Sequence, residues 1–303
     1  MKEAIPIADS GNAFLIMNPA AGQKLLADPR AQVESACREC GLKCEIALTE
    51  RPGHGTQLAR EAVSSGHALV VAAGGDGTVN EVVAGMVGAD VSLGIIPIGT
   101  VNVLARQFGI PMKVRPAVET LASGKVRRID IGRSNDRYFT LMAGFGFDAE
   151  VVAGVLRPLK DVIGASAYVL KGLEMLSRYE ATDLTLEMPN ETYSCRAYLV
   201  VVANSPTYAY KLRLAPYAST EDGLFDVIVF EEQSSSKQIG FAHQIVDVLI
   251  RTHVHNPAVK YFKTPTVTVR SHPDVMVQLD GDACGVTPAE VLILPQALPL
   301  IVP

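Results

Sequence analysis

The sequence predicts two domains: an N-terminal, Rossmann-like α/β domain built on a parallel sheet, and a C-terminal, mainly antiparallel β-sandwich. Up to residue 124, apolar runs without polar alternation are separated by segments with helical spacing, as is typical of a parallel sheet covered on both faces. Later strand-like segments are joined by turn-like pairs such as Ser134-Asn135, which favours antiparallel pairing. With 48% hydrophobic and 19% charged residues in a chain of 303, both domains can bury a core.

Local signals predict the elements of the first domain. Strands are expected at Phe14–Met17, Cys44–Leu48, 68–74 and Ser92–Pro97. Helices are expected after Asp28-Pro29, at Thr56–Ser65, after Thr78 and around Asn102. Asp28 supplies an N-cap and Pro29 fits a first helical position, while Gly66 is a stop signal. Parallel sheets bind ligands beyond the carboxyl ends of their strands, which predicts one site formed by the loops at Asn18, Thr49, Gly74 and Thr100.

The second domain is expected to contain many short strands and two helices. The strands are Val126–Gly132, Tyr138–Ala143, Asp183–Met188, Ala197–Ala203, Phe225–Phe230, Thr266–Arg270 and Val275–Leu279. The helices lie near Ala165–Ser177 and Ser236–Arg251. Leu292–Leu294 and the tail to Pro303 are expected to return to the first domain, so the predicted domains are residues 1–124 with 295–303, and residues 125–294.

The strongest functional signal is the loop Gly74-Gly75-Asp76-Gly77-Thr78, between a buried strand and a helix. Glycine lets backbone N–H groups approach an anion closely, and the Asp76 carboxylate suits a magnesium ion. The loop therefore predicts a site for a phosphate and magnesium; the structural alternative is a tight turn with Asp76 or Thr78 as N-cap. The G-x-x-x-x-G-K-[ST] loop of P-loop enzymes is absent, and no dinucleotide fingerprint follows the first strand.

Charge and composition argue against several other classes. A net charge of −5 argues against nucleic acid as a partner. A basic run then forms a solvated strand face or a local basic surface, at Lys125, Arg127, Arg128, Arg133 and Arg137. The five cysteines suggest no disulfide framework, and Cys37-x-x-Cys40 lacks a second pair at zinc-finger spacing. Apolar runs end well before the ~20 residues needed to span a bilayer, so we expect a cytoplasmic protein.

Taken together, these motifs resemble the diacylglycerol kinase catalytic-domain family, in the bacterial lipid kinase branch that is related to sphingosine and ceramide kinases. The resemblance runs from Asn18 to about Asp282. It rests on five motifs in order: Asn18-Pro19-x-x-Gly22, Gly74 to Glu81, Gly99-Thr100-x-Asn102, Asp222-Gly223-Leu224-Phe225-Asp226 and Asp280-Gly281-Asp282. It implies an NAD kinase/diacylglycerol kinase-like architecture with a nucleotide-binding first domain and a lipid-substrate second domain.

The resemblance also implies site residues. ATP would contact Asn18, Pro19, Ala20, Ala21, Gly22, Thr49, Gly74, Gly75, Asp76, Gly77, Thr78, Val79, Asn80 and Thr100. A structural magnesium ion would be held by Ser219, Asp222 and the carbonyl of Leu224. The family's general base is the Glu of Asp-Gly-Glu, whose place is taken here by the shorter Asp282. Many relatives carry Asp where Val103 stands. For Asn18-Pro19, Asp222-Gly223 and Asp280–Asp282, simple turns are the structural alternative.

The implied reaction moves the γ-phosphoryl group of ATP, bound with magnesium between the domains, to a lipid hydroxyl such as that of diacylglycerol or phosphatidylglycerol. Asp282 would deprotonate or orient the hydroxyl, and Asp76 would help to hold the metal. Side chains that line a lipid channel or belong to the core are Phe145, Phe147, Val151, Val152, Val155, Leu156, Val162, Ile163, Tyr168 and Leu173. A lipid substrate implies transient contact with the inner membrane face; the oligomeric state stays open, a homodimer included.

Two alternatives remain. An NAD kinase shares a G-G-D-G-T loop, although Asn80-Glu81 and the Asn18 segment favour the lipid branch. A regulatory nucleotide- or lipid-binding protein with weak catalysis is supported by Val103 and Asp282.

Overall fold

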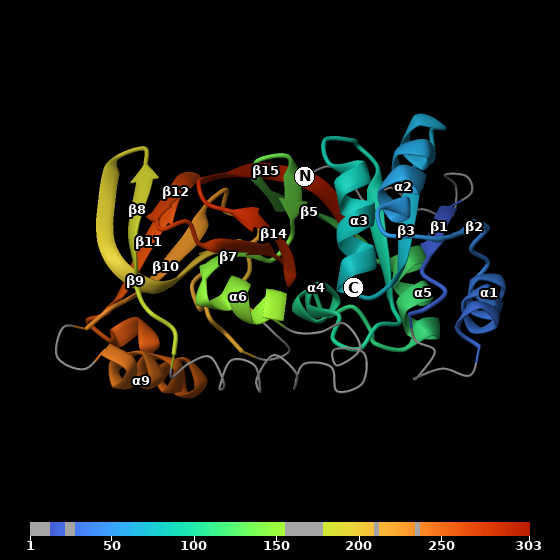
Figure 1. Cartoon of the computed structure of the whole chain (residues 1–303). Helices are drawn as coiled ribbons and strands as arrows, with labels where there is room; N and C mark the ends of the chain where they lie inside the picture. The colour runs from blue at the N-terminus through green and yellow to red at the C-terminus, as the bar shows by residue number, and fades with distance from the viewer. Residues whose placement is uncertain (1–12, 22–27, 155–177, 209–211, 234–236) are drawn as a thin grey trace. The chain divides into compact units, whose positions relative to one another are not determined.

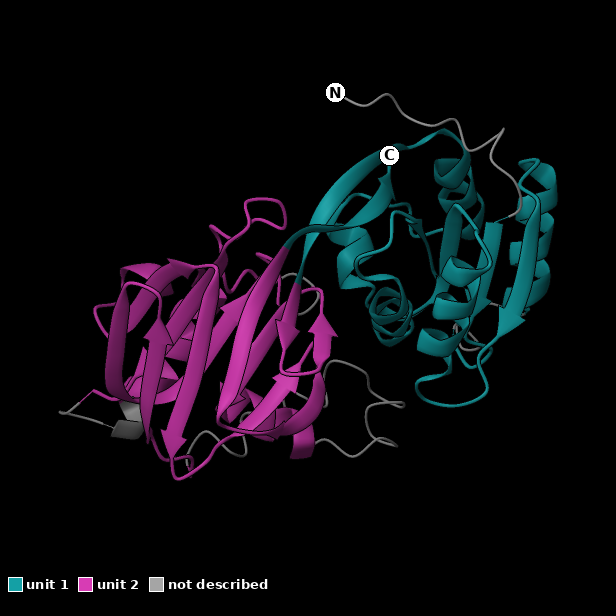
Figure 2. Ribbon diagram, turned by 90° about the horizontal axis from the view of Figure 1, so that it is seen from above, with its two compact units in different colours: residues 1–131, 295–303 teal, residues 132–294 magenta. Residues whose placement is uncertain are grey.

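The structure, a computed structural model, describes residues 13–21, 28–154, 178–208, 212–233 and 237–303. The chain divides into two compact units: unit 1 holds residues 1–131 and 295–303, and unit 2 holds residues 132–294 (Figure 2). The first boundary lies inside strand β5 (Lys125–Ser134), later than the sequence-based boundary after residue 124. The second lies inside strand β15 (Ala289–Val302), so both connections between the units are continuous strands.

Unit 1 is a parallel sheet with helices on its faces (Figure 1). Its strands are β1 (Ala13–Met17), β2 (Cys44–Leu48), β3 (Leu69–Gly74) and β4 (Ser92–Pro97), paired in the order β4-β3-β1-β2. Its helices are α1 (Pro29–Glu39), α2 (His54–Ser64), α3 (Asp76–Met86), α4 (Val103–Gln107) and α5 (Val114–Ser123). The end of β15 pairs in parallel with β4 through Leu300 and Leu93, so the tail returns to the first unit as the sequence predicts.

The strands of unit 1 are apolar on both faces because helices cover both. β1 and β3 are buried along their whole length. One face, which includes Leu15 and Val71, packs against side chains of α1 and α5. Helices α2 and α3 pack together, and Gly85 of α3 lies so close to α2 that a Cβ there would stand 2.5 Å from the carbonyl oxygen of Thr56.

Unit 2 is built from antiparallel strands, and its described residues include two α-helices. Its strands, besides parts of β5 and β15, are β6 (Arg137–Phe139), β7 (Met142–Gly146), β8 (Thr182–Met188), β9 (Glu191–Ala203), β10 (Phe225–Glu231), β11 (Val259–Thr264), β12 (Thr266–His272), β13 (Met276–Leu279) and β14 (Asp282–Val286). They pair in the order β14-β13-β7-β9-β8-β12-β15, with β10 between β9 and β11. The described helices are α6 (Phe147–Gly154) and α9 (Lys237–Ile250), followed by one 3₁₀ turn, η2 (His253–His255). The core includes Phe145, Val200, Phe225 and Val269.

The structure differs from the sequence-based elements in a few places. The segment Tyr138–Ala143, expected as one strand, is divided between β6 and β7. The helix expected after Thr78 begins at Asp76, so most of the glycine loop belongs to its first turn. The strands β11 and β14 and the helices α5 and α6 were not expected, and the helix expected at Ala165–Ser177 lies outside the described residues.

Candidate active site

Four loops lie at the carboxyl edge of the parallel sheet in unit 1. They follow β1, β2, β3 and β4, and they begin at Asn18, Thr49, Gly75 and Ile98. The four strands are adjacent and parallel, so their carboxyl ends share one edge. From β1 the chain moves to one side of the sheet to form β2, and from β3 it moves to the other side to form β4. The order of the strands therefore reverses between β1 and β3, which is the point at which open α/β sheets bind ligands.

Asn18 connects the loops on the two sides of this switch point. Its backbone N–H donates to the carbonyl oxygen of Ala73 at 3.1 Å, and its Nδ2 donates to Oγ1 of Thr78 at 3.4 Å. Its Oδ1 accepts a hydrogen bond of 2.9 Å from the N–H of Ala20 and so shapes the turn that begins at Pro19. The Asn18 side chain therefore connects the turn after β1 to the Thr78 hydroxyl.

Close packing of two loops requires glycine at positions 74 and 99. A Cβ on Gly74 would lie 2.3 Å from Oγ1 of Thr78, and a Cβ on Gly99 would lie 2.4 Å from Cα of Gly75. The backbones that follow β3 and β4 are thus in contact. Gly77 differs, because nothing lies within 4 Å of its Cβ position and the residue is exposed. Glycine at position 77 leaves open space beside the first turn of α3.

Helix α3 begins at Asp76 and no side chain caps it. The N–H groups of a first helical turn lack intrahelical partners, and together with the helix dipole they favour an anion. Oδ1 of Asp76 accepts a hydrogen bond of 2.7 Å from the N–H of Val103, the first residue of α4. This bond fixes the Asp76 carboxylate and joins the starts of two helices. Val103 takes part through its backbone, and its side chain is buried.

Asn102 belongs to this edge as well, although we did not include it among the predicted site residues. Its side chain is 3% exposed, its φ of 52° lies in the left-handed region, and its Nδ2 donates to the carbonyl oxygen of Gly99 at 2.7 Å. Within the described residues, its buried Oδ1 has no hydrogen-bond partner. Such an acceptor is costly to leave unpaired, which makes Asn102 a candidate contact for a ligand donor. The motif Gly99-Thr100-x-Asn102 was the available signal.

Glu81, which follows the glycine loop, has a structural role. Its two carboxylate oxygens accept hydrogen bonds of 2.8 Å from the N–H of Gly53 and 2.9 Å from the N–H of Gly55, at the start of α2. Its carbonyl oxygen accepts a bond of 2.8 Å from Oγ1 of Thr56. Glu81 therefore caps α2 from the neighbouring helix and holds in place the segment that follows Thr49.

In unit 2, Asp280 and Gly281 form the two-residue turn between β13 and β14. Both have positive φ, 47° and 86°, as a type I′ hairpin turn requires. The Asp280 carboxylate accepts hydrogen bonds from the N–H groups of Thr140, Leu141 and Met142 at 2.6 to 2.9 Å, and from Oγ1 of Thr140 at 3.0 Å. These bonds explain why the strand expected at Tyr138–Ala143 is interrupted, because three of its N–H groups turn toward Asp280.

Asp282 is the first residue of β14, directly after this turn, and its side chain is exposed. In the part of the chain that the structure describes, no ion pair or hydrogen bond engages its carboxylate. A fixed backbone with an exposed carboxylate is a suitable arrangement for a group that accepts a proton from a substrate.

Comparison with known proteins identifies the family. Residues 12–134 match the model of the diacylglycerol kinase catalytic domain, and residues 142–302 match the model of the YegS C-terminal NAD kinase beta sandwich-like domain. A diacylglycerol kinase of Bacillus subtilis (strain 168) is 33% identical over 294 residues, which cover 96% of each chain. The chain belongs to the diacylglycerol kinase catalytic-domain family. A diacylglycerol kinase of Staphylococcus saprophyticus is 31% identical over 293 residues, which cover 96% of this chain and 95% of the relative.

Solved structures of this family show the same fold. A diacylglycerol kinase from Bacillus anthracis str. Sterne superposes with a TM-score of 0.78 at 23% identity and covers 96% of this chain and 97% of that chain. A second crystal structure from the same organism gives a TM-score of 0.82 at 22% identity, covering 96% and 95% of the two chains. The α/β unit followed by an antiparallel β-sandwich is therefore the fold shared with these structures. The family model and the curated relatives show that the chain is a lipid kinase, a phosphotransferase with an alcohol group as acceptor.

Lys263 of β11 lies beside the loop that the resemblance assigns to a structural metal. Oδ2 of Asp222 lies 3.2 Å from Nζ of Lys263, which also lies 3.1 Å from Oδ2 of the buried Asp226. Oδ1 of Asp222 accepts from the N–H of Leu224 at 3.2 Å, and Oγ of Ser219 accepts from the N–H of Glu221 at 3.3 Å.

Lys263 forms ion pairs with both Asp222 and Asp226. Burial opposes the charge of Lys263, but its hydrogen bonds to Asp226 and Asp222 outweigh burial and raise its pKa. No group of three His, Cys, Asp or Glu side chains in the described residues is placed to hold a metal. Ser219, Asp222 and the carbonyl of Leu224 are oxygen donors of the kind that magnesium takes, so their role as its ligands stays a prediction, and we assign no catalytic step to that ion.

Other sequence-based expectations have clear positions in the structure. Phe145 belongs to the core of unit 2, and Phe147, Val151 and Val152 of α6 are buried; the other candidates for a lipid channel lie outside the described residues. Gly22 of the predicted ATP site also lies outside them. Thr49 is half-buried and Thr100 is exposed.

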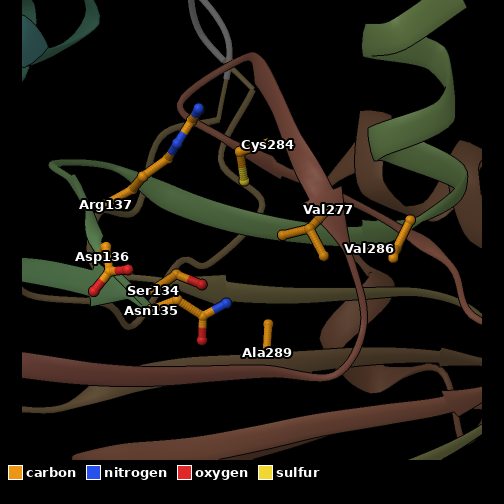
Figure 3. A pocket seen from close by; sticks show the side chains of 8 residues that line it. All are labelled: Ser134, Asn135, Asp136, Arg137, Val277, Cys284, Val286 and Ala289. Carbon is orange, nitrogen blue, oxygen red and sulfur yellow. The ribbon is translucent and has the colours of Figure 1, made fainter.

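Two surface features of the described residues lie apart from the predicted site. Arg128 of the basic run forms an ion pair with Asp90, and Arg127 lies over the ring of Phe108 at 5.4 Å. A small hollow in unit 2, shown in Figure 3, is lined by Ser134, Asn135, Asp136, Arg137, Val277, Cys284, Val286 and Ala289. None of the predicted site residues lines it. Among the described helices, none combines the length and the apolar character that crossing a membrane requires.

Proposed function

We propose that the protein transfers the γ-phosphoryl group of MgATP to the hydroxyl group of a diacylglycerol-like or phosphatidylglycerol-like lipid. The observation that carries the proposal is the glycine loop at the switch point of the parallel sheet, where Asn18 and Thr78 are hydrogen-bonded. It is supported by the relatives that match nearly the whole chain, which are diacylglycerol kinases.

The nucleotide would bind at the carboxyl edge of the sheet in unit 1. The uncapped N–H groups of α3 would receive a phosphate, and the open space at Gly77 would let it approach. The hydroxyl of Thr78, held by Asn18, and that of the exposed Thr100 would donate to phosphate oxygens. Asp76, fixed by the Val103 N–H, would face the magnesium ion that arrives with ATP. Pro19–Gly22, Thr49, Val79 and Asn80 complete the proposed nucleotide site.

The acceptor would bind in unit 2, with Asp282 as general base. The carboxylate would accept the proton of the lipid hydroxyl as its oxygen attacks the γ-phosphorus and ADP leaves. Aspartate is one methylene shorter than glutamate, so the hairpin turn must hold the Asp282 carboxylate close to the lipid hydroxyl. The protein would be cytoplasmic. It would meet the inner membrane face transiently, because diacylglycerol resides in membranes. A homodimer is compatible with this proposal and is not required by it.

A transfer assay tests the proposal. Purified protein is incubated with γ-labelled ATP and magnesium, in separate reactions with vesicles that contain diacylglycerol, with vesicles that contain phosphatidylglycerol, and with NAD. We expect label in the phosphorylated lipid. Transfer to NAD alone would contradict the lipid proposal and favour an NAD kinase. ATP binding without transfer to any acceptor would favour a regulatory binding protein.

The variant Asp282→Asn tests the proposed base. Removal of a general base costs about 10²- to 10⁴-fold in rate, and we expect kcat to fall within that range while the affinity for ATP is retained. Asp274→Asn is the matched control, since Asp274 is exposed and lies before the same hairpin. Full activity of Asp282→Asn would remove Asp282 from the mechanism.

A further inference from the structure

Gln278 is a buried amide beside the turn that carries Asp282. It lies in β13 with 1% of its side chain exposed. Its Oε1 accepts a hydrogen bond of 2.7 Å from the N–H of Gly281, and its Nε2 donates to Oδ2 of Asp148 at 2.6 Å. Both ends of the amide are therefore used, one on the turn and the other on a carboxylate from α6.

Asp148 fixes which way the amide of Gln278 faces. The N–H of Gly281 can only donate and Oδ2 of Asp148 accepts from Nε2, so both partners select the same orientation of the Gln278 amide. Asp148 is 7% exposed, and its Oδ1 accepts from the hydroxyl of Tyr208. Gly144 makes room for this arrangement, because a Cβ there would lie 2.1 Å from Oδ2 of Asp148. Burial raises the pKa of Asp148, while the bonds from Tyr208 and Gln278 act in the opposite direction.

The turn before Asp282 is consequently held at two successive residues. Asp280 is anchored through its carboxylate to the start of β7, and Gly281 is anchored through its N–H to Gln278. Asp280 has a positive φ, which costs energy in a residue other than glycine, so the turn can relax to another shape if an anchor is lost. The Gly281 anchor is the nearer one, a single residue before Asp282. A displacement of about 1 Å at a reacting group costs about 10²-fold in rate.

We propose that Gln278 is a positioning residue for Asp282, with Asp148 and Tyr208 holding its amide in the required orientation. The inference rests on the proposed function, since Asp282 is the base in that mechanism. Gln278 touches neither reactant; it acts through the Gly281 N–H on the direction in which the Asp282 carboxylate points.

The test compares variants in the full-length protein. Gln278→Leu removes both ends of the amide at similar volume, and Asp148→Leu removes the acceptor that orients it. Asp148→Asn is the conservative variant, because its amide oxygen still accepts from Nε2 of Gln278. Gln244→Leu is the matched control: Gln244 is buried in the same unit and donates to the carbonyl oxygen of Glu231 at 2.8 Å, away from the turn.

Each variant is measured for kcat, for KM of ATP and of the lipid, for thermal stability, and for hydrogen exchange at the Gly281 amide. We expect Gln278→Leu and Asp148→Leu each to lower kcat by about 10²-fold and to leave KM for ATP unchanged. Exchange at Gly281 should accelerate in both. The double variant should be no slower than either single variant, because the two residues act in one chain. Asp148→Asn should stay within a few-fold of the unaltered protein.

The outcomes separate this inference from the function on which it rests. If the unaltered protein phosphorylates no lipid, the proposed function falls and the positioning role falls with it. If Asp282→Asn abolishes transfer but Gln278→Leu retains kcat, only the positioning role is overturned. If Gln244→Leu lowers kcat as much as Gln278→Leu does, the effect is general destabilisation and the positioning role is again overturned.

Discussion

At the scale of single residues, Asp280 and Asp282 differ sharply although one residue separates them. The Asp280 carboxylate is engaged by three backbone N–H groups and one hydroxyl, whereas the Asp282 carboxylate is exposed. The sequence predicts a turn and a pair of acids, and the structure contains the turn. The sequence does not predict which of the two carboxylates is hydrogen-bonded and which is exposed, because the partners of Asp280 lie 138 to 140 residues earlier in the chain.

The glycine loop gives a prediction at the same scale, because we expect glycine to be needed at positions 74 and 77 for different physical reasons. Gly74→Ala would place a Cβ 2.3 Å from Oγ1 of Thr78, so we expect a large loss of thermal stability. Gly77→Ala meets nothing within 4 Å, and alanine is favoured over glycine in a helix by up to about 1 kcal/mol. We therefore expect Gly77→Ala to keep or raise stability while it weakens ATP binding by obstructing the phosphate.

Thermal unfolding and ATP titration of both variants test this difference. Ala84→Gly, at a half-buried position of the same helix, is the comparison variant and measures the helix preference together with the loss of one methyl group. If Gly77→Ala binds ATP as tightly as the unaltered protein, the phosphate does not approach at Gly77.

At the scale of elements, local signals predict those elements whose determinants are local. Asp28 caps α1 through a hydrogen bond of 3.0 Å from the N–H of Ala31, as the dipeptide Asp28-Pro29 indicates. The strand Cys44–Leu48 has the predicted bounds, with Lys43 before it and Thr49 and Glu50 after it. The start of α3 was placed too late, because its cap position is held by Gly75 without any side-chain cap and so lacks a sequence signal.

A second prediction at the scale of elements concerns Glu81, whose side chain connects α3 to α2. Its carboxylate accepts the N–H groups of Gly53 and Gly55, and hydrogen bonds to charged groups contribute about 1.5 to 3 kcal/mol each. We expect Glu81→Ala to lower the free energy of unfolding by about 2 kcal/mol or more. Glu61→Ala is the control, since Glu61 is an exposed residue of α2 that contacts only Gln57 of the same helix through its carboxylate.

Chemical denaturation measures both variants. A loss for Glu81→Ala no larger than that for Glu61→Ala would show that the contact with α2 adds no stability. Exchange of the Gly53 and Gly55 amides reports the same contact directly, and it should accelerate in Glu81→Ala alone.

At the scale of the whole molecule, the two units share strands, and this follows from the sequence only in part. The apolar tail signals a return to the first unit, and β15 makes that return beside β4. The boundary inside β5 has no such signal, because the strand continues without a turn across residues 131 and 132. A continuous strand is physically two half-strands with different partners, and sequence periodicity cannot separate them.

The last nine residues close unit 1, and this gives a prediction about the entire chain. Leu298, Leu300, Ile301 and Val302 are buried, with at most 4% of each exposed. Each buried aliphatic side chain contributes about 1.5 to 3 kcal/mol, so their removal costs an amount comparable to the 5 to 15 kcal/mol that stabilises a typical domain. We expect a protein that ends at residue 294 to lose the cooperative unfolding of unit 1 and its binding of ATP. Deletion of the exposed Pro303 alone is the control and should change neither property. Thermal unfolding and ATP titration of both proteins decide the matter: a truncated protein that unfolds cooperatively and binds ATP would show that unit 1 is complete without its final strand.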